Sequence, residues 1–433
     1  MNTRFSSLAV FAFLIGPLSA TEVPPGWETR SVREEVRPEF SFLGEGGPDG
    51  TGGLVICCTG GEEQIGCWKK EFPVAGGKWY RFSARRKTTG VAYPVRSAPA
   101  RLIWMNAGKR MVRGEEDVRW PDYPPDRTTD ETGWTEVSAV YQAPEQATQV
   151  MVELYLQWAP GGRVEWSLPR LEERDPPEPR LVRLAGVHYT PSGGKTREEN
   201  LRQFAAPVAK AAEAGADLVC LGEAITYVGT GMSAAEAAEP IPGPSTEFLA
   251  DLAKTHRVHL VAGLYERVDK TIYNTAVLLG ADGRLLGKYR KLCLPREEVE
   301  GGMAPGSEYP VFKTGLGTIG LMVCWDVHFP EVARGLGLRG AEIIAMPIWG
   351  GNPTLAAARA IENQCFLVTS TYSSGEKQMK TGVLDPRGEW LATAKEQGEI
   401  AIAEVDLNKT YYWRFLGDFR NRVWRERPVG GFE

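Results

Sequence analysis

The feature that most constrains the fold is an alternation, from residue 181 onward, of short apolar runs with segments of helical periodicity. Continuous apolar runs of this kind are typical of strands that are buried on both faces. One helix is expected between an N-cap at Thr196, which has capping-box spacing to Glu199, and a stop at Gly215. The pattern predicts an α/β layered domain over residues 181–415.

Residues 21–175 show a different pattern, in which apolar and polar positions alternate with a period of two. Clusters of Gly, Pro and Asp separate the short runs, and helical periodicity is almost absent, so we expect a β-sandwich module. Eight of the 13 Trp residues lie before residue 170, and we expect most of them to pack in its core. The clearest strand face consists of Val150, Val152, Leu154, Leu156 and Trp158.

A charged, proline-rich stretch separates the two patterns. It runs from Glu172 to Pro179, and we take residues 176–180 as the linker. Proline removes backbone donors and stiffens the chain, which favours a semi-rigid connection. Residues 416–433 follow the α/β pattern and are expected to form a C-terminal tail.

The first twenty residues have the organisation of a targeting segment. Arg4 is the only charge before Glu22, an apolar run extends from Leu8 to Leu18, and small residues end it. A short positive region, a short apolar core and a small-residue site are typical of a secretory signal peptide, and the run is too short to span a bilayer. We therefore expect residues 1–20 to be a signal peptide and the chain to be exported, to the periplasm or the extracellular space.

Export permits disulfides, and the chain has seven Cys residues. Cys57 or Cys58 could bridge Cys67 around a Gly-rich loop, although adjacent strand residues point to opposite faces and only one of the pair would reach. Three buried thiols are the alternative, and the sequence leaves both open. An odd number leaves at least one thiol unpaired within the chain.

Composition excludes some functions. With 50 Lys+Arg against 55 Asp+Glu, the formal net charge is −5, which argues against a basic nucleic-acid binder. The sequence has no CxxC pair and no zinc-ligand spacing, so we expect no metal site. We expect no cofactor either, because the chemistry inferred below needs only side chains and water.

Three residues at predicted strand ends could carry chemistry. Glu223 ends one buried strand, Lys291 follows another, and Cys324 lies where the apolar strand 319–323 meets a helix. Ligand sites of α/β sheets form at strand ends, and N–H groups at a helix start favour a thiolate. A carboxylate can serve such a Cys as a base, and an ammonium can stabilise an oxyanion.

The region 182–408 resembles the nitrilase superfamily of carbon–nitrogen hydrolases. Five stretches carry the resemblance: Ala216-Asp-Leu-Val-Cys-Leu-Gly-Glu223, Gly287-Lys-Tyr-Arg-Lys291, Gly320-Leu-Met-Val-Cys324-Trp-Asp-Val-His-Phe-Pro-Glu331, Arg359-Ala-Ile-Glu-Asn-Gln364 and Asp385-Pro-Arg-Gly388. Their order and combined specificity make a chance match a poor explanation. The resemblance implies a four-layer αββα sandwich with a Cys-Glu-Lys triad.

In that triad Cys324 would be the nucleophile, Glu223 the general base and acid, and Lys291 the oxyanion partner, with the Trp325 N–H as second donor. The family often uses a second carboxylate after the Lys; we select Glu300, with Glu298 as the alternative. Trp349 follows a strand end, so it is a candidate pocket residue, and packing is an equal alternative.

The resemblance implies hydrolysis of a linear amide or N-carbamoyl compound through a thioester, with release of ammonia or an amine. Asp326 follows Cys-Trp, where true nitrilases more often carry Glu, so amide or carbamoyl substrates are preferred over nitriles and a true nitrilase is the alternative. Gly222 stands where a proline commonly precedes the Glu, and Cys293 where a histidine commonly follows Tyr-Arg-Lys. Family members commonly pair their sandwiches, so a homo-oligomer is expected.

The N-terminal module resembles the jelly-roll carbohydrate-binding modules in its general layout. The shared features are Gly66-Cys-Trp68, Gly77-Lys-Trp-Tyr80 and Gly133-Trp-Thr135. The resemblance implies that exposed aromatic rings would stack on sugar rings, which makes a glycan a candidate partner. A catalytically idle glycan-binding protein is therefore a further alternative to the hydrolase.

Overall fold

The computed structural model describes residues 22–112 and 120–429, and the expected signal peptide at 1–20 lies outside them. The chain divides into two compact units between Pro176 and Pro177. The segment 413–417 and the described residues from Arg425 onward belong to the first unit, whereas 418–424 belong to the second. The C-terminal region therefore does not form the separate tail that we expected at 416–433, because both units incorporate parts of it.

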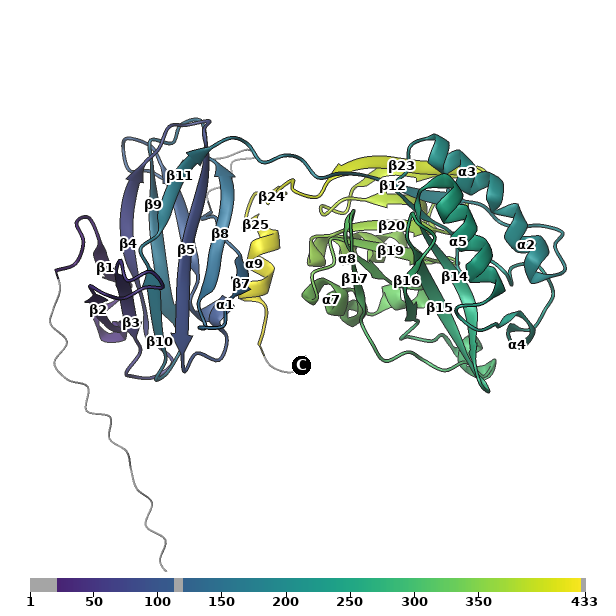
Figure 1. The fold of residues 1–433 in the computed structure, drawn as a ribbon, viewed down its shortest axis with the longest axis horizontal. Coiled ribbons are helices and arrows are strands. Elements are labelled where there is room, and N and C mark those ends of the chain that lie inside the picture. Colours follow the sequence, from purple (N-terminus) through teal and green to yellow (C-terminus); the bar gives the residue numbers. More distant parts are fainter. Residues whose placement is uncertain (1–21, 113–119, 430–433) are drawn as a thin grey trace, which may run out of the picture. The chain divides into compact units, whose positions relative to one another are not determined.

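The first unit consists of two sheets, and the pairs of neighbouring strands that the structure describes in them are antiparallel. Figure 1 draws its strands in purple to blue. The 4-stranded sheet has the order β1 (Glu28–Ser31), β4 (Ile65–Pro73), β9 (Gln149–Gln157) and β6 (Ala100–Met105). The 7-stranded sheet has the order β2 (Glu39–Leu43), β3 (Gly53–Cys57), β10 (Arg163–Ser167), β5 (Trp79–Thr89), β8 (Thr135–Gln142) and β7 (Asp126–Thr129), with β11 (Arg170–Arg174) beside β5. Its short helices are η1 (Glu34–Val36) and α1 (Pro94–Ser97).

Side chains from both sheets form one apolar core. Most of the early Trp residues are buried, as expected: Trp27, Trp68, Trp104, Trp134 and Trp166. Val150, Val152, Leu154 and Leu156 are fully buried, as the period of two predicted. Trp158 was wrongly placed on this face. Strand β9 ends at Gln157, Trp158 has a positive φ of 53°, and its side chain is 47% exposed.

The three early cysteines are free thiols in the structure. Cys57 ends β3 of the larger sheet, whereas Cys67 lies in β4 of the smaller sheet. Cys58 and Cys67 are both buried, as expected if these residues pack as thiols and form no disulfide. Burial raises the pKa of the Cys58 thiol to about 11 and that of Cys67 to about 12, so neither is a reactive thiolate at neutral pH.

The second unit contains two 6-stranded sheets. One has the order β16 (Leu285–Arg290), β15 (Thr271–Leu279), β14 (His259–Val268), β13 (Leu218–Cys220), β12 (Leu181–His188) and β23 (Glu399–Asp406). The other has the order β17 (Val311–Thr314), β18 (Gly317–Leu321), β19 (Ile343–Pro347), β20 (Phe366–Ser370), β21 (Thr381–Leu384) and β22 (Trp390–Ala394). Four pairs of neighbouring strands in the described part of this unit are parallel: β12 with β13, β13 with β14, β18 with β19, and β19 with β20.

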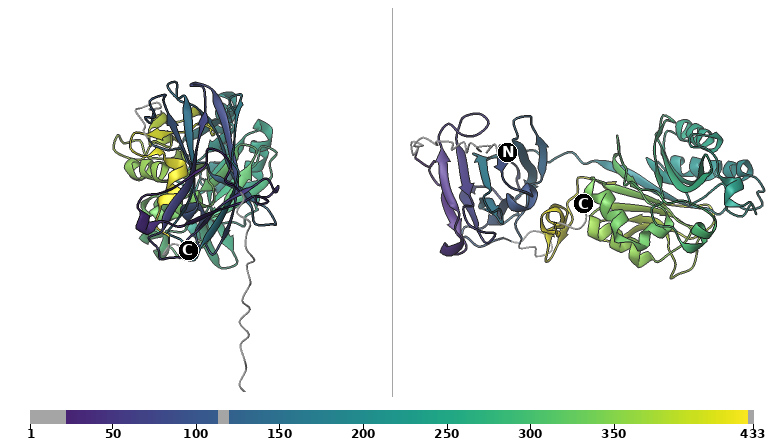
Figure 2. Two further views of the ribbon diagram at one scale, coloured as in Figure 1. Left: turned by 90° about the vertical axis from the view of Figure 1, so that its left-hand side faces the viewer. Right: turned by 90° about the horizontal axis from the view of Figure 1, so that it is seen from below.

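Helices cover the outer faces of these paired sheets. The helices of the unit are α2 (Arg197–Gln203), α3 (Ala205–Glu213), α4 (Ala234–Ala237), α5 (Pro244–His256), α6 (Arg296–Glu300), η3 (Cys324–His328), α7 (Pro330–Leu338) and α8 (Pro353–Asn363). Figure 2 shows α2, α3 and α5 in teal on one side and α7 and α8 in green on the other. One apolar core lies between the sheets and another lies beneath α3 and α5. Along the described ranges, no helix combines the length and apolarity needed to cross a membrane.

The helix expected between Thr196 and Gly215 is interrupted. Thr196 caps α2 as predicted, because its hydroxyl accepts the Glu199 N–H at 3.2 Å. The break at Phe204 separates α2 from α3. Pro207 has no N–H to donate to the carbonyl of Gln203, so the helical ladder is broken at that turn.

The two sheets approach each other closely at Gly186 in β12. A Cβ at this position would lie 2.4 Å from the carbonyl oxygen of Thr369 in β20. Only glycine therefore fits without a shift of backbone. The remaining elements lie near the C-terminus: β24 (Tyr412–Trp413), β25 (Gly417–Asp418) and α9 (Phe419–Glu426).

Candidate active site

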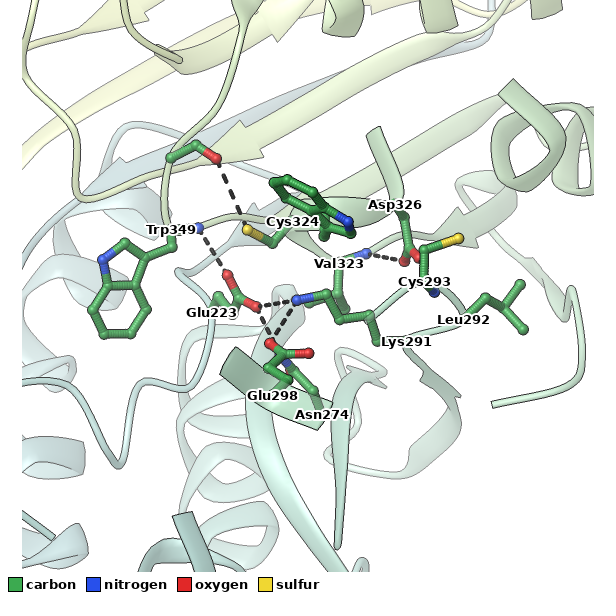
Figure 3. A network of polar contacts seen from close by, with 12 residues as sticks. Glu223, Asn274, Lys291, Leu292, Cys293, Glu298, Val323, Cys324, Asp326 and Trp349 are labelled. Atoms are coloured by element: carbon green, nitrogen blue, oxygen red, sulfur yellow. Dashed lines mark hydrogen bonds and ion pairs between the residues drawn. The ribbon is translucent and has the colours of Figure 1, made fainter. Parts of the chain in front are cut away.

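The ends of three strands bring the predicted triad together. Glu223 follows β13 and is 3% exposed, and Lys291 follows β16 and is 1% exposed. Cys324 begins η3, three residues after β18 ends. Figure 3 shows the three side chains in one cluster. Apolar strands thus place polar end residues where the two sheets of the unit meet.

Hydrogen bonds join the carboxylates of this cluster to one ammonium. Lys291 Nζ donates to Glu223 Oε1 at 3.1 Å and to Glu298 Oε1 at 2.6 Å. Asn274 Nδ2 donates to the same two oxygens, at 2.7 Å and 2.8 Å. The second oxygen of Glu223 accepts the backbone N–H of Trp349 at 2.9 Å. Both oxygens of Glu223 are therefore held by donors, which fixes the direction of its carboxylate (Figure 3).

The backbone at Cys324 is unusual, since a non-glycine residue here has a positive φ of 43°. Its thiol donates to the carbonyl oxygen of Gly350 across 3.8 Å. Burial, together with the negative charge and hydrogen bond of Glu223, raises the pKa of the thiol well above its usual value, and Lys291 opposes this. The resting side chain is therefore a thiol beside a carboxylate, so a base must remove its proton during attack.

Lys291 keeps its charge despite its burial. Burial opposes the ammonium form, but the neighbouring Glu223, Cys324 and Glu298 outweigh that effect and raise the pKa above its usual value. Lys291 is accordingly a fixed cation rather than a proton donor at neutral pH. A buried cation of this kind can stabilise an oxyanion that develops beside it.

The structure places Glu298, not Glu300, beside Lys291. Both belong to helix α6, but Glu300 is exposed and pairs with Arg296 at 2.6 Å. Residues two apart on a helix point in different directions, so only one of them can face the cluster. Burial raises the pKa of Glu298 although Lys291 opposes the shift, and its Oε2 is buried without a hydrogen-bond partner. The selection of Glu300 as the second carboxylate thus has no geometric support.

Asp326 connects the backbone around Cys324 with the backbone around Lys291. It is fully buried, and its carboxylate accepts the Val323 N–H at 3.0 Å, the Cys293 N–H at 2.9 Å and the Tyr289 hydroxyl at 2.7 Å. Burial raises its pKa to about 6, although these donors oppose the shift. One carboxylate therefore ties both catalytic loops together.

The remaining predicted residues lie around this cluster. Trp325 follows Cys324 in the first turn of η3, where backbone N–H groups have no partner within the helix, as an oxyanion donor requires. Its indole stacks on His328, with 4.2 Å between the ring centroids. Trp349 contributes its N–H to Glu223, and its side chain is 43% exposed. Cys293 contributes its backbone N–H to Asp326.

Two residues of the cluster escaped the sequence analysis. Asn274 lies inside strand β15, most of whose residues are buried. A polar residue in such a run indicates a buried hydrogen-bond partner, so the sequence could have pointed to Asn274. Tyr372 follows β20, and its hydroxyl donates to the backbone carbonyl of Glu223 at 2.6 Å. Nothing in the local sequence around Tyr372 indicates that contact, because the two residues are 149 positions apart.

The side chains of this cluster include a nucleophile, a base and a cation. Among residues 22–112 and 120–429, no group of three or more His, Cys, Asp or Glu side chains could hold a metal ion. A nucleophile, a directed carboxylate and a buried cation form the arrangement that acyl transfer through a covalent intermediate needs.

A family model described as carbon–nitrogen hydrolase matches residues 182–415. The chain belongs to the carbon–nitrogen hydrolase family. The match covers the α/β unit that holds Glu223, Lys291 and Cys324. This carbon–nitrogen hydrolase acts on carbon–nitrogen bonds other than peptide bonds.

Curated relatives match the same half of the chain. A protein named nitrilase from Pyrococcus abyssi is 34% identical over 240 residues, which are 52% of this chain and 90% of the relative. Omega-amidase NIT2 from Homo sapiens is 30% identical over 234 residues, 49% of this chain and 85% of the relative. Among solved structures, Saccharomyces cerevisiae Nit3 is 27% identical with a TM-score of 0.46, and covers 52% of this carbon–nitrogen hydrolase and 90% of its own chain.

Proposed function

We propose that the protein is an exported amidase, which hydrolyses a linear amide or N-carbamoyl compound through a thioester on Cys324. The observation that carries the proposal is the directed carboxylate of Glu223. It lies between the Cys324 thiol and the Lys291 ammonium, and both of its oxygens are held by donors.

In the first half of the reaction, the sulfur–carbon bond forms and the thiol proton moves to Glu223. The carbonyl oxygen becomes an oxyanion, and the Lys291 ammonium with the Trp325 N–H stabilises it. The carbon–nitrogen bond then breaks, Glu223 gives its proton to the departing nitrogen, and ammonia or an amine leaves.

In the second half, water attacks the thioester. Glu223 accepts a proton from this water, the carbon–sulfur bond breaks, and the thiol is regenerated with release of the acid. Lys291 stabilises the second oxyanion in the same way. Lys291 stays charged throughout, which agrees with the raised pKa that its carboxylate neighbours impose.

The direct test is a substrate panel with ammonia release as the measurement. Primary aliphatic amides, N-carbamoyl amino acids and aliphatic nitriles would be incubated with the mature chain and with Cys324→Ala. We expect ammonia from amides or carbamoyl compounds and none from the variant. Turnover of nitriles alone would favour a true nitrilase, and equal turnover by Cys324→Ala would overturn the proposal.

We further propose that the first unit, which resembles jelly-roll carbohydrate-binding modules, takes a glycan at Trp158. This indole is 47% exposed, a positive φ of 53° holds it out of the core, and the Arg96 guanidinium stacks on it at 5.1 Å. Exposed indole faces stack on flat apolar faces of sugars. A glycan array with the full mature chain and Trp158→Ala tests this proposal; binding that Trp158→Ala retains, or no binding, would contradict it.

Export and self-association are also proposals. The apolar run from Leu8 to Leu18 after Arg4 supports export, and cell fractionation with N-terminal sequencing of the mature chain would test it. Family membership supports a homo-oligomer, which light scattering on the purified protein would test. A cytoplasmic, uncleaved chain would contradict the first proposal, and a monomer would contradict the second.

A further inference from the structure

The Tyr372 ring packs directly against Gly222, the residue before Glu223, and leaves no room there for a Cβ atom. A Cβ on Gly222 would lie 2.6 Å from the Tyr372 hydroxyl oxygen, 2.7 Å from Cζ and 2.9 Å from Cε1. Real Cβ atoms do not approach other atoms so closely, so the tyrosine ring excludes any larger residue at position 222. The close approach of the ring is therefore the reason for a glycine immediately before Glu223.

The same ring fixes the backbone of Glu223. Its hydroxyl donates to the Glu223 carbonyl oxygen at 2.6 Å. Burial and the nearby charge of Glu223 raise the pKa of Tyr372 well above its usual value, so the hydroxyl stays protonated and remains a donor. A buried carbonyl that loses such a donor pays the cost of an unmade hydrogen bond.

Gly263 in β14 also packs against the backbone of Glu223. A Cβ on Gly263 would lie 2.7 Å from the Cα of Glu223. The Gly263 N–H donates to the Gly222 carbonyl at 3.0 Å, and its carbonyl accepts the Ile225 N–H at 2.9 Å. The turn that carries Glu223 is thus held by contacts with strand β14 as well as with the Tyr372 ring.

Tyr372 also contacts the second element that directs the carboxylate. Its ring centroid lies 5.3 Å from that of Trp349, whose N–H donates to Glu223 Oε2. The hydroxyl of the preceding Thr371 donates to the Trp349 carbonyl at 2.8 Å. The 371–372 segment therefore sets both the backbone of Glu223 and the donor to its side chain.

We propose that Tyr372 is a positioning residue, matched to Gly222, that aims the Glu223 carboxylate at the Cys324 thiol. The inference rests on the proposed role of Glu223 as general base. Rigid support for a catalytic group matters because a misplacement of about 1 Å can cost about 10²-fold in rate. The hydroxyl acts through Glu223 and does not touch the reacting atoms.

The first test compares kcat and KM of Tyr372→Phe with those of Tyr189→Phe. The control loses a tyrosine hydroxyl that donates to Gln203 at 3.2 Å in the same unit. We expect Tyr372→Phe to lower kcat by about tenfold to 10²-fold with little change in KM, and the control to keep both values. An unchanged kcat in Tyr372→Phe, with substrate turned over normally, would overturn the proposal.

A double-mutant cycle tests whether Gly222 and the Tyr372 ring depend on each other sterically. Gly222→Ala should lower kcat strongly when Tyr372 is present, and should cost little more when Tyr372→Ala has already removed the ring. Thermal unfolding of each variant separates loss of fold from loss of alignment. Additive effects on kcat in folded variants would show that the two residues are not matched.

A measurement that needs no substrate tests the positioning role of Tyr372 independently of the proposed amidase activity. Glu223 suppresses the Cys324 thiolate, so Glu223→Gln should let iodoacetamide alkylate Cys324 at lower pH. Tyr372→Phe should shift the pH profile of Cys324 alkylation in the same direction, and Tyr189→Phe should not shift it. Peptide mass spectrometry would identify Cys324 as the alkylated residue. If the substrate panel yields no ammonia, the proposed function fails, whereas an unshifted alkylation profile in Tyr372→Phe refutes the positioning role.

Discussion

The ammonium of Lys291 lies 2.6 Å from the carboxylate of Glu298, whose side chain is largely buried. Glu298 and Glu223 share both the Lys291 and Asn274 donors, so the cation lies between two carboxylates. Glu223 alone would balance the charge of Lys291. We therefore expect the second carboxylate to hold Lys291 in place while Glu223 acts as the proposed base.

Glu298→Gln should lower kcat by about 10²-fold, because it removes the shorter of the two anionic contacts of Lys291. Glu300→Gln is the matched control on the same helix, and it should leave kcat unchanged since Glu300 is exposed and pairs with Arg296. Steady-state ammonia release measures both. A larger loss in Glu300→Gln than in Glu298→Gln would show that this placement is wrong.

Asp326 should make stability depend on pH. Its pKa is raised to about 6 in the folded state from 3.8, so the folded state binds the proton more tightly than the unfolded state. The cost of ionisation is then fully present above pH 6 and is relieved as the pH falls from 6 toward 4. Relative to Asp326→Asn, which cannot titrate, the wild type should gain on the order of 3 kcal/mol over that range.

Urea unfolding of the wild type and of Asp326→Asn at several pH values between 4 and 7 measures this difference. Only its pH dependence tests the assignment, because the substitution also disturbs the donors that meet at Asp326. A difference in unfolding free energy that stays constant across the range would refute the raised pKa.

Gly186→Ala should strongly destabilise the second unit. The added methyl would lie 2.4 Å from the Thr369 carbonyl oxygen, which is backbone and cannot turn aside. We expect a loss of about 1–3 kcal/mol or more, as for other overpacked interiors. Gly315→Ala is the control, since its Cβ would meet nothing within 4 Å. Thermal unfolding compares the two, and equal melting temperatures would contradict the close sheet contact.

Arg425→Ala should destabilise the first unit, although Arg425 is encoded near the C-terminus. Its guanidinium is 5% exposed and donates to the carbonyls of Val95 at 2.8 Å and Pro124 at 2.6 Å. Loss of both donors should cost about 1–3 kcal/mol. Lys109→Ala, which removes an exposed ion pair with Glu71, should change stability by less than about 1 kcal/mol.

Calorimetry of the full chain measures the Arg425 effect, and an unchanged first-unit transition would refute it. Loss of the same contacts should also lower the stability of a truncated protein that lacks Arg425. Residues 22–176 alone lack Arg425, so we expect them to melt at a lower temperature than the same unit in the full chain.

Local patterns in the sequence were enough to predict the α/β unit and the three residues that meet in its site. Glu223, Lys291 and Cys324 each follow a predicted strand, and ligand sites of α/β sheets form at strand ends. The period of two likewise predicted the buried face of β9 from Val150 to Leu156, but not the turn outward at Trp158. That turn depends on a backbone angle, which side-chain periodicity does not encode.

Only the tertiary structure decided between Glu298 and Glu300, because both lie on one short helix and the direction of α6 relative to Lys291 depends on packing. It alone placed Asn274 and Tyr372 against Glu223, since those contacts join segments 51 and 149 residues apart. It also assigned Arg425 to the first unit. The sequence by itself thus determined which residue types carry the chemistry, whereas long-range packing decided which side chains hold them in position, because that depends on distances between segments that no local pattern records.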